Sequence, residues 1–144
     1  MSEPLAVACP ACLALNRVPP DRLAERPRCG RCSQPLFAGA PVVLDGAGWR
    51  AHVVRATLPV LVDVWAPWCG PCLSLAPQFE RAAVELEPQL RLGKLDSQAE
   101  PGLAGQLGIR SIPTLVLFDR GHERARQSGA MAAADIVRWA RQHV

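Results

Sequence analysis

Apolar and polar positions alternate along the chain in blocks that predict strands and helices in turn. Runs rich in branched apolar residues predict strands at residues 41–45, 60–65, 90–96 and 114–118, and a weaker strand at 123–127. Stretches of helical composition or spacing predict helices between and after them, at residues 48–55, 69–86, 100–107 and 131–142. This alternation predicts an α/β fold with a central mixed sheet flanked by helices.

The first 36 residues form a separate, cysteine-rich segment. Cys9 and Cys12 form one Cys-x-x-Cys pair, Cys29 and Cys32 form another, and sixteen residues lie between the pairs. Two such pairs at this spacing predict one structural zinc ion held by four thiolates, with two disulfides or free redox thiols as the alternatives. Because so short a segment buries little apolar surface, metal would supply much of its folding free energy. We therefore expect a zinc-ribbon head at residues 1–36 and a second domain at residues 37–144.

Charge and composition narrow the possible partners. The head has five arginines against three acidic residues, and four thiolates plus one zinc ion would bring its charge to about zero. It also lacks aromatic residues, so nucleic acid is not an expected partner.

No apolar run approaches the ~18 residues of a membrane span, and the first ten residues do not resemble a secretory signal. We expect a cytoplasmic protein without a membrane partner, in a compartment where Cys-x-x-Cys pairs bind metals or act as catalysts.

A third pair, Cys69 and Cys72, lies where an apolar strand gives way to a helix. This spacing suits a reversible disulfide, whereas a zinc pair or inert core cysteines are the alternatives. Unpaired N–H groups and the positive end of the helix dipole would favour the thiolate of Cys69 and lower its pKa, so we expect it to be the nucleophile. Cys72, one turn further on, suits the resolving role. Gly70 and Pro71 allow the tight turn and preset the first helical φ angle.

Residues 65–72, Trp-Ala-Pro-Trp-Cys-Gly-Pro-Cys, with Asp63 before them and the sequence Ile-Pro-Thr at 112–114, closely resemble the motifs of the thioredoxin family. With the cysteine-rich head, the chain is most similar to the zinc-ribbon-containing bacterial members. The resemblance implies a thioredoxin fold and a thiol–disulfide oxidoreductase that reduces protein disulfides. It also implies an NADPH-dependent thioredoxin reductase as partner and no bound redox cofactor. Nothing in the sequence demands more than a monomer.

The resemblance also implies roles for residues around the two cysteines. Asp63, whose pKa burial should raise, would take the proton of Cys72 through water, with Lys94 near its carboxylate. The alternatives are a solvent-facing aspartate and an ordinary exposed lysine. Pro113 would be a cis-proline facing the disulfide, and the exposed backbone of Ile112 would pair with an extended substrate segment. The residues expected at the substrate are Trp68, Gly70, Pro71, Ile112, Pro113 and Gly129.

Leu73 departs from the family pattern, because many members carry Lys or Arg directly after the second cysteine. Its presence removes one positive charge near the site.

Two other functions stay open at this point. The head could be a zinc-dependent binding module that recruits a partner, or a redox sensor whose oxidation ejects zinc. His52, His122 and His143 show no partner pattern, so we expect surface positions or satisfied side chains.

Overall fold

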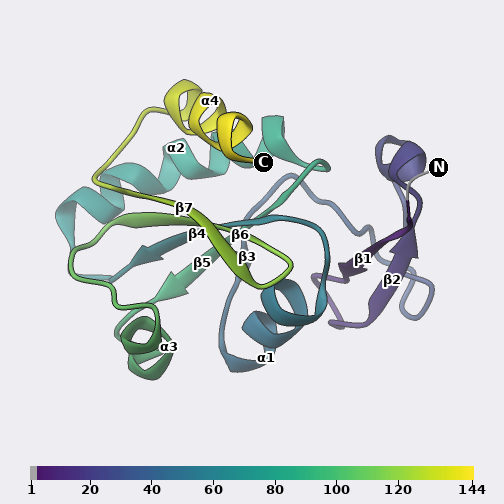
Figure 1. The fold of residues 1–144 in the computed structure, drawn as a ribbon, viewed down its shortest axis with the longest axis horizontal. Helices are drawn as coiled ribbons and strands as arrows, with labels where there is room; N and C mark the ends of the chain where they lie inside the picture. Colours follow the sequence, from purple (N-terminus) through teal and green to yellow (C-terminus); the bar gives the residue numbers. More distant parts are fainter. Residues whose placement is uncertain (1–2) are drawn as a thin grey trace.

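The computed structural model describes residues 3–144 and places them in two sheets, with helices around the larger one (Figure 1). The head comprises strands β1 (Leu5–Ala8) and β2 (Leu15–Val18) and the 3₁₀ helix η1 (Pro20–Glu25). The remainder contains β3 (Val42–Val43), α1 (Gly46–Trp49), the π-helical segment η2 (Arg50–Arg55), β4 (Val60–Trp65), α2 (Gly70–Leu86), β5 (Arg91–Asp96), α3 (Pro101–Gln106), β6 (Thr114–Asp119), β7 (His122–Ser128) and α4 (Ala133–His143).

The larger sheet is mixed, and its strand order is β3-β5-β4-β6-β7. Strands β3 and β4 run parallel to β5, whereas β6 and β7 are antiparallel to their neighbours. Helices α2 and α4 cover one face, and α1 with α3 cover the other (Figure 1). The predicted central mixed sheet flanked by helices is therefore confirmed, and β4 lies at its centre because both faces of this apolar strand are buried.

Alternation along β4 decides which side chains lie beneath α2. Leu61 packs in the core cluster that α2 and α4 form, whereas Val60, Val62 and Val64 pack in the cluster on the opposite face. Since successive side chains of a strand point to opposite faces, Asp63 shares the face of Leu61. The carboxylate therefore lies on the side of the sheet that α2 covers.

Several element ends differ from the sequence predictions. The first helix begins at Gly46 because the Asp45 carboxylate caps it, accepting the Gly48 N–H at 2.7 Å. The strand expected at 41–45 shortens to the two residues that pair with β5. The last helix begins at Ala133 rather than 131, since Ala132 is extended and the Ala133 N–H donates to Gln78 Oε1 at 3.0 Å.

The head packs directly on the larger domain. Val7, Val18 and Leu36 of the head form a buried cluster together with Leu58, which precedes β4. The backbones also pair, because the Thr57 N–H donates to the Ala6 carbonyl oxygen at 2.9 Å. Removing the head would therefore expose apolar surface of the larger domain.

One member of a buried ion pair, Arg91, also bonds the head. Arg91, at the start of β5, pairs with Glu87 at 3.0 Å, and both side chains are almost fully buried. A second guanidinium nitrogen donates to the Ala8 carbonyl oxygen at 2.8 Å, directly before the first head cysteine. The guanidinium also lies 4.8 Å from the centroid of the Phe37 ring. Arg91 thus connects α2, β5 and the head through one side chain.

The three histidines divide into two kinds. His122 and His143 are exposed, and each has a ring nitrogen near a backbone carbonyl oxygen. His52 is buried instead, within η2. Burial, with a smaller contribution from Arg91, lowers its pKa to about 4, so His52 is neutral at pH 7.

Candidate redox site and metal centre

Cys69 and Cys72 are joined as a disulfide at the start of α2. Cys69 is the residue that caps the helix, and its Sγ accepts the backbone N–H of Cys72 at 3.2 Å. Gly70 and Pro71 occupy the first helical positions, where proline loses no intrahelical bond. The sulfur of Cys69 therefore lies at the positive end of the helix dipole, where a thiolate is favoured.

The two cysteines differ slightly in their exposure to solvent. The exposed fraction is 6% for Cys69 and 1% for Cys72. Next to Cys69, the indole of Trp68 is 71% exposed, and Leu73 on the first turn of α2 is 54% exposed. Trp65 is half-buried and packs against the cluster that Ala66, Cys69 and Cys72 form. Exposed apolar side chains thus lie beside Cys69, the more exposed cysteine of the pair.

Asp63 lies in the interior of the domain, on the face of β4 that α2 covers. Its side chain is fully buried, and neither carboxylate oxygen has a hydrogen-bond partner within residues 3–144. Burial raises the pKa of Asp63 to about 7, against an opposing effect of the Lys94 charge. Lys94 pairs with Asp63 in the register of β4 and β5, and its Nζ lies 4.4 Å from the centroid of the Trp65 ring. A carboxyl group with this pKa gives up or takes up a proton near neutral pH.

The segment before β6 lies opposite the disulfide. The Ile112–Pro113 peptide bond is cis, as the family resemblance implied. The carbonyl oxygen of Ile112 is 3.9 Å from Sγ of Cys69, so the backbone at this residue lies beside the more exposed sulfur. Gly129, with φ +97°, donates its N–H to the Pro113 carbonyl oxygen at 2.9 Å. The structure thus brings together Cys69, Ile112, Pro113 and Gly129 from three parts of the sequence.

The four head cysteines converge on one point. Their sulfur atoms all lie within 4.8 Å of one another, with Cys9–Cys32 at 3.5 Å and Cys12–Cys29 at 3.6 Å. Four thiolates around a tetrahedral zinc ion, each with a Zn–S bond of about 2.3 Å, lie roughly 3.8 Å apart. Backbone N–H groups of Ala11 and Arg31 donate to the sulfurs of Cys9 and Cys29, both at 3.3 Å. The donor set therefore fits a closed four-thiolate zinc site.

The fold and the redox site define a class of protein. A disulfide at the start of a helix, beside exposed apolar side chains and with a buried carboxyl group on the sheet face that the helix covers, suits reversible thiol–disulfide exchange. The class is that of the dithiol–disulfide oxidoreductases.

Comparisons with known proteins identify the family. The family model described as thioredoxin matches residues 40–142, and one described as the N-terminal part of thioredoxin 2 matches residues 8–34. Thioredoxin C-3 of Corynebacterium nephridii is 39% identical over 140 residues, which is 97% of this chain and 96% of that protein. The chain belongs to the thioredoxin family, and it carries the zinc-ribbon head of thioredoxin 2.

Other comparisons cover the redox domain alone. The bifunctional thioredoxin reductase/thioredoxin of Mycobacterium leprae is 41% identical over 101 residues, covering 70% of this chain and 22% of that protein. The solved structure of Malassezia sympodialis thioredoxin matches with a TM-score of 0.67 at 27% identity, covering 74% of this chain and 93% of that one. The protein is therefore a thiol–disulfide oxidoreductase that acts as a protein disulfide reductase. Among residues 3–144, no helix is both long enough and apolar enough to span a membrane.

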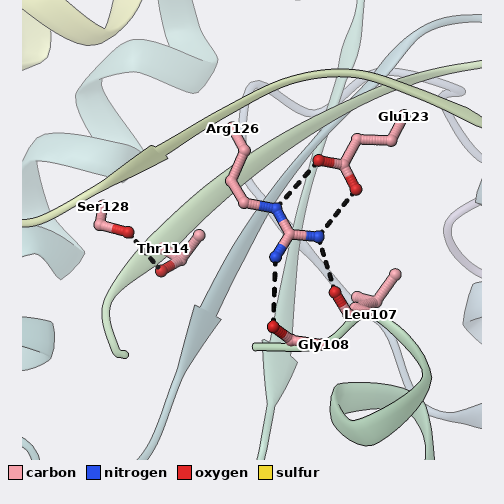
Figure 2. A network of polar contacts seen from close by, with 6 residues as sticks. All are labelled: Leu107, Gly108, Thr114, Glu123, Arg126 and Ser128. Carbon is pink, nitrogen blue, oxygen red and sulfur yellow. Dashed lines mark hydrogen bonds and ion pairs between the residues drawn. The ribbon is translucent and has the colours of Figure 1, made fainter. Parts of the chain in front are cut away.

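Sequence reasoning did not identify two groups of polar residues. Arg91, which pairs with Glu87, joins the head to the larger domain, and Arg126 on β7 holds the segment before β6 (Figure 2). The sequence around Arg91 does contain one indication of burial, because this charged residue lies between the apolar Leu90 and Leu92. Asp63 lies among apolar neighbours in β4 in the same way. The sequence around Arg126 contains no such indication, since this residue lies among polar residues on an exposed strand.

Proposed function

We propose that the protein reduces protein disulfides through Cys69 as nucleophile and Cys72 as resolving thiol. The observation that carries this assignment is the disulfide itself, which caps α2 with Cys69 more exposed than Cys72. The thiolate of Cys69 attacks one sulfur of the substrate disulfide. A mixed disulfide forms, and the other substrate sulfur leaves as a thiolate.

Cys72 then completes the transfer of two electrons. Asp63, with its pKa near 7, accepts the proton of the Cys72 thiol through water. The resulting thiolate attacks Sγ of Cys69, which forms the intramolecular disulfide and releases the second substrate sulfur as a thiolate. Lys94 acts on this step indirectly, because its charge opposes the rise in the Asp63 pKa.

We propose that an extended segment of the substrate lies along the Ile112 backbone. Its N–H and carbonyl groups are available for pairing of the β type, and Pro113 lacks an N–H. The residues proposed to contact the substrate are Trp68, Gly70, Pro71, Ile112, Pro113 and Gly129. An NADPH-dependent thioredoxin reductase would return the disulfide to the dithiol, and the joined reductase and thioredoxin in the Mycobacterium leprae relative's name support this partner.

For the head, we propose residues 1–36 as a ribbon that holds one zinc ion through Cys9, Cys12, Cys29 and Cys32, with residues 37–144 as the redox domain. Zinc bound there would cross-link the head, and four thiolates would leave it no open position for catalysis. We further propose a monomer that works in the cytoplasm, where these thiols stay reduced. The packing of the head on Leu58 and Arg91 favours a structural role over that of a tethered recruitment module.

Turnover of insulin disulfides with thioredoxin reductase and NADPH tests the assignment. Cys69→Ser should abolish turnover, whereas Cys12→Ser, which breaks the zinc site, should retain most of it. A point variant is preferable to removal of residues 1–36, because the head covers apolar surface of the redox domain. Full activity of Cys69→Ser would overturn the proposal. Zinc content before and after mild peroxide treatment tests the sensor alternative, which unchanged zinc with intact thiols would contradict.

A further inference from the structure

The segment at residues 107–113 carries the backbone proposed to bind substrate, yet it is neither helix nor strand. It begins at the end of α3 and leads into β6, and Ile112 lies beside Cys69 near its end. A segment without regular hydrogen bonding needs other contacts to hold its backbone in one place. Side chains of the exposed strand β7 contact its beginning directly, and its end through Thr114, the first residue of β6 (Figure 2).

Arg126 holds the beginning of the segment. Its Nη2 donates to the Leu107 carbonyl oxygen at 2.7 Å, and its Nη1 to that of Gly108 at 3.4 Å. These carbonyl groups follow α3, where a helix leaves such acceptors without intrahelical partners and where a cation is favoured. Glu123 orients the guanidinium, because its two carboxylate oxygens accept from Nε at 2.9 Å and Nη2 at 2.8 Å (Figure 2). The guanidinium group of Arg126 is thus oriented by the Glu123 carboxylate and donates to the backbone carbonyl oxygens of residues 107 and 108.

Ser128 holds the end of the segment. It lies two residues after Arg126 and hence on the same face of β7. Its Oγ lies 3.1 Å from Oγ1 of Thr114, and that hydroxyl donates to the Ser111 carbonyl oxygen at 2.7 Å. The next residue, Gly129, donates to the Pro113 carbonyl oxygen. The backbone of Ile112 therefore lies between two anchors that the same strand provides.

Arg124 offers a comparison on the same strand. It also forms an ion pair, with Asp119 at 3.2 Å, but its side chain is 59% exposed and the pair lies away from the substrate segment. The Arg126 side chain is 31% exposed. Arg124 and Arg126 thus both form ion pairs, but only Arg126 also bonds the backbone at residues 107 and 108. Comparing variants of the two arginines therefore measures the effect of that backbone contact.

We propose that Arg126 is a positioning residue for the exchange of protein disulfides. Together with Glu123 it fixes the beginning of the 107–113 segment, so that the Ile112 backbone is in place before a substrate chain pairs with it. This rests on the proposed binding of substrate along Ile112. A protein substrate needs that backbone, whereas a small aromatic disulfide needs only access to Cys69. Loss of Arg126 therefore slows reduction of the protein disulfide selectively.

The test compares two substrates in the full-length protein after prior reduction, without the reductase. Second-order rate constants are measured for insulin and for 5,5′-dithiobis(2-nitrobenzoic acid) in the wild type, Arg126→Gln and Arg124→Gln. Arg126→Gln should lower the insulin rate constant about five- to tenfold, with the small disulfide changed less than twofold, because charge-assisted hydrogen bonds that order the backbone are lost. Arg124→Gln should leave both rate constants near those of the wild type.

Two further variants keep the test decisive if Arg126→Gln folds poorly. Arg126→Lys keeps the charge but loses the guanidinium group, so it should restore part of the insulin rate. Glu123→Gln keeps Arg126 but weakens its orientation, and it should lower the insulin rate by a smaller factor. Equal insulin rates in the Arg126 and Arg124 variants, or a parallel loss with both substrates, would overturn the proposal. A wild type that reduces neither substrate would instead refute the proposed function.

Discussion

Replacing Asp63 with asparagine should stabilise the protein, and the gain should depend on pH. The carboxylate is fully buried, and its oxygens have no hydrogen-bond partner among the residues described. Ionising it in the folded protein is therefore costly, whereas in the unfolded chain it ionises at an ordinary pKa. Asparagine has nearly the same shape and no charge, so Asp63→Asn removes the cost of ionisation and leaves the burial of one polar group unchanged.

The size of the gain follows from the change in the pKa. Folding raises the pKa of Asp63 from 3.8 to about 7, and at 1.36 kcal/mol per pH unit this corresponds to about 4 kcal/mol. Between these two values the folded protein binds more protons than the unfolded chain does, so the free energy of unfolding of the wild type falls as pH rises. The advantage of Asp63→Asn should thus be near zero at pH 4, grow through pH 7 and level off at about 4 kcal/mol above it.

Urea unfolding of the oxidised protein at pH values from 4 to 9 measures this difference. Loss of zinc from the head at low pH affects both proteins alike, so it cancels in the comparison. Asp135→Asn serves as control, because Asp135 is exposed and forms a surface pair with Arg138 whose contribution is at most about 1 kcal/mol. The reasoning would be refuted if the difference in free energy of unfolding between Asp63→Asn and the wild type stayed constant over the pH range. It would also be refuted if Asp63→Asn were less stable than the wild type at pH 9.

Three further outcomes test other parts of the molecule. Arg91→Ala leaves the Glu87 carboxylate buried without its partner and should cost about 3–5 kcal/mol in urea unfolding; a loss below about 1 kcal/mol would contradict the role of this pair. Leu73→Lys adds a cation on the first turn of α2 and should raise the thiolate fraction of reduced Cys69 about twofold, an effect lost in 1 M salt. Alkylation rates measured over a range of pH values check this, and an increase that salt does not remove would argue against a charge effect. Cys72→Ser should accumulate a mixed disulfide with insulin, visible by mass spectrometry, whereas its absence would count against Cys72 as the resolving thiol.

Much of the fold could be predicted because it depends on local pattern. The run at β4 is apolar except for Asp63, and it became the central strand, buried on both faces as expected. The spacing of the head cysteines predicted their convergence, because a Cys-x-x-Cys turn presents two sulfurs on one side whatever the rest of the chain does. Element ends were less accurate, since the start of α4 depends on a contact with Gln78 from another helix.

Polar contacts between distant segments could not be predicted in this way. Arg91 donates to the backbone carbonyl oxygen of Ala8, 83 residues earlier in the chain. Because every residue has such a carbonyl group, the residue type at position 8 does not indicate this contact. Arg126 and Arg124 are chemically identical and two positions apart, yet their neighbours differ. Such contacts depend on which segments the fold brings together.

The sequence by itself determined the class of fold, the two kinds of cysteine pair and the family, because each depends on residues that are close along the chain. Only the tertiary structure decided that the Asp63 carboxylate has no hydrogen-bond partner within residues 3–144, that the Ile112 carbonyl oxygen lies beside Cys69, and that β7 contacts the segment at residues 107–113. The physical reason is that burial and long-range hydrogen bonds belong to the packed arrangement of elements. Short-range periodicity determines whether a segment forms a helix or a strand, and packing determines which groups its side chains contact.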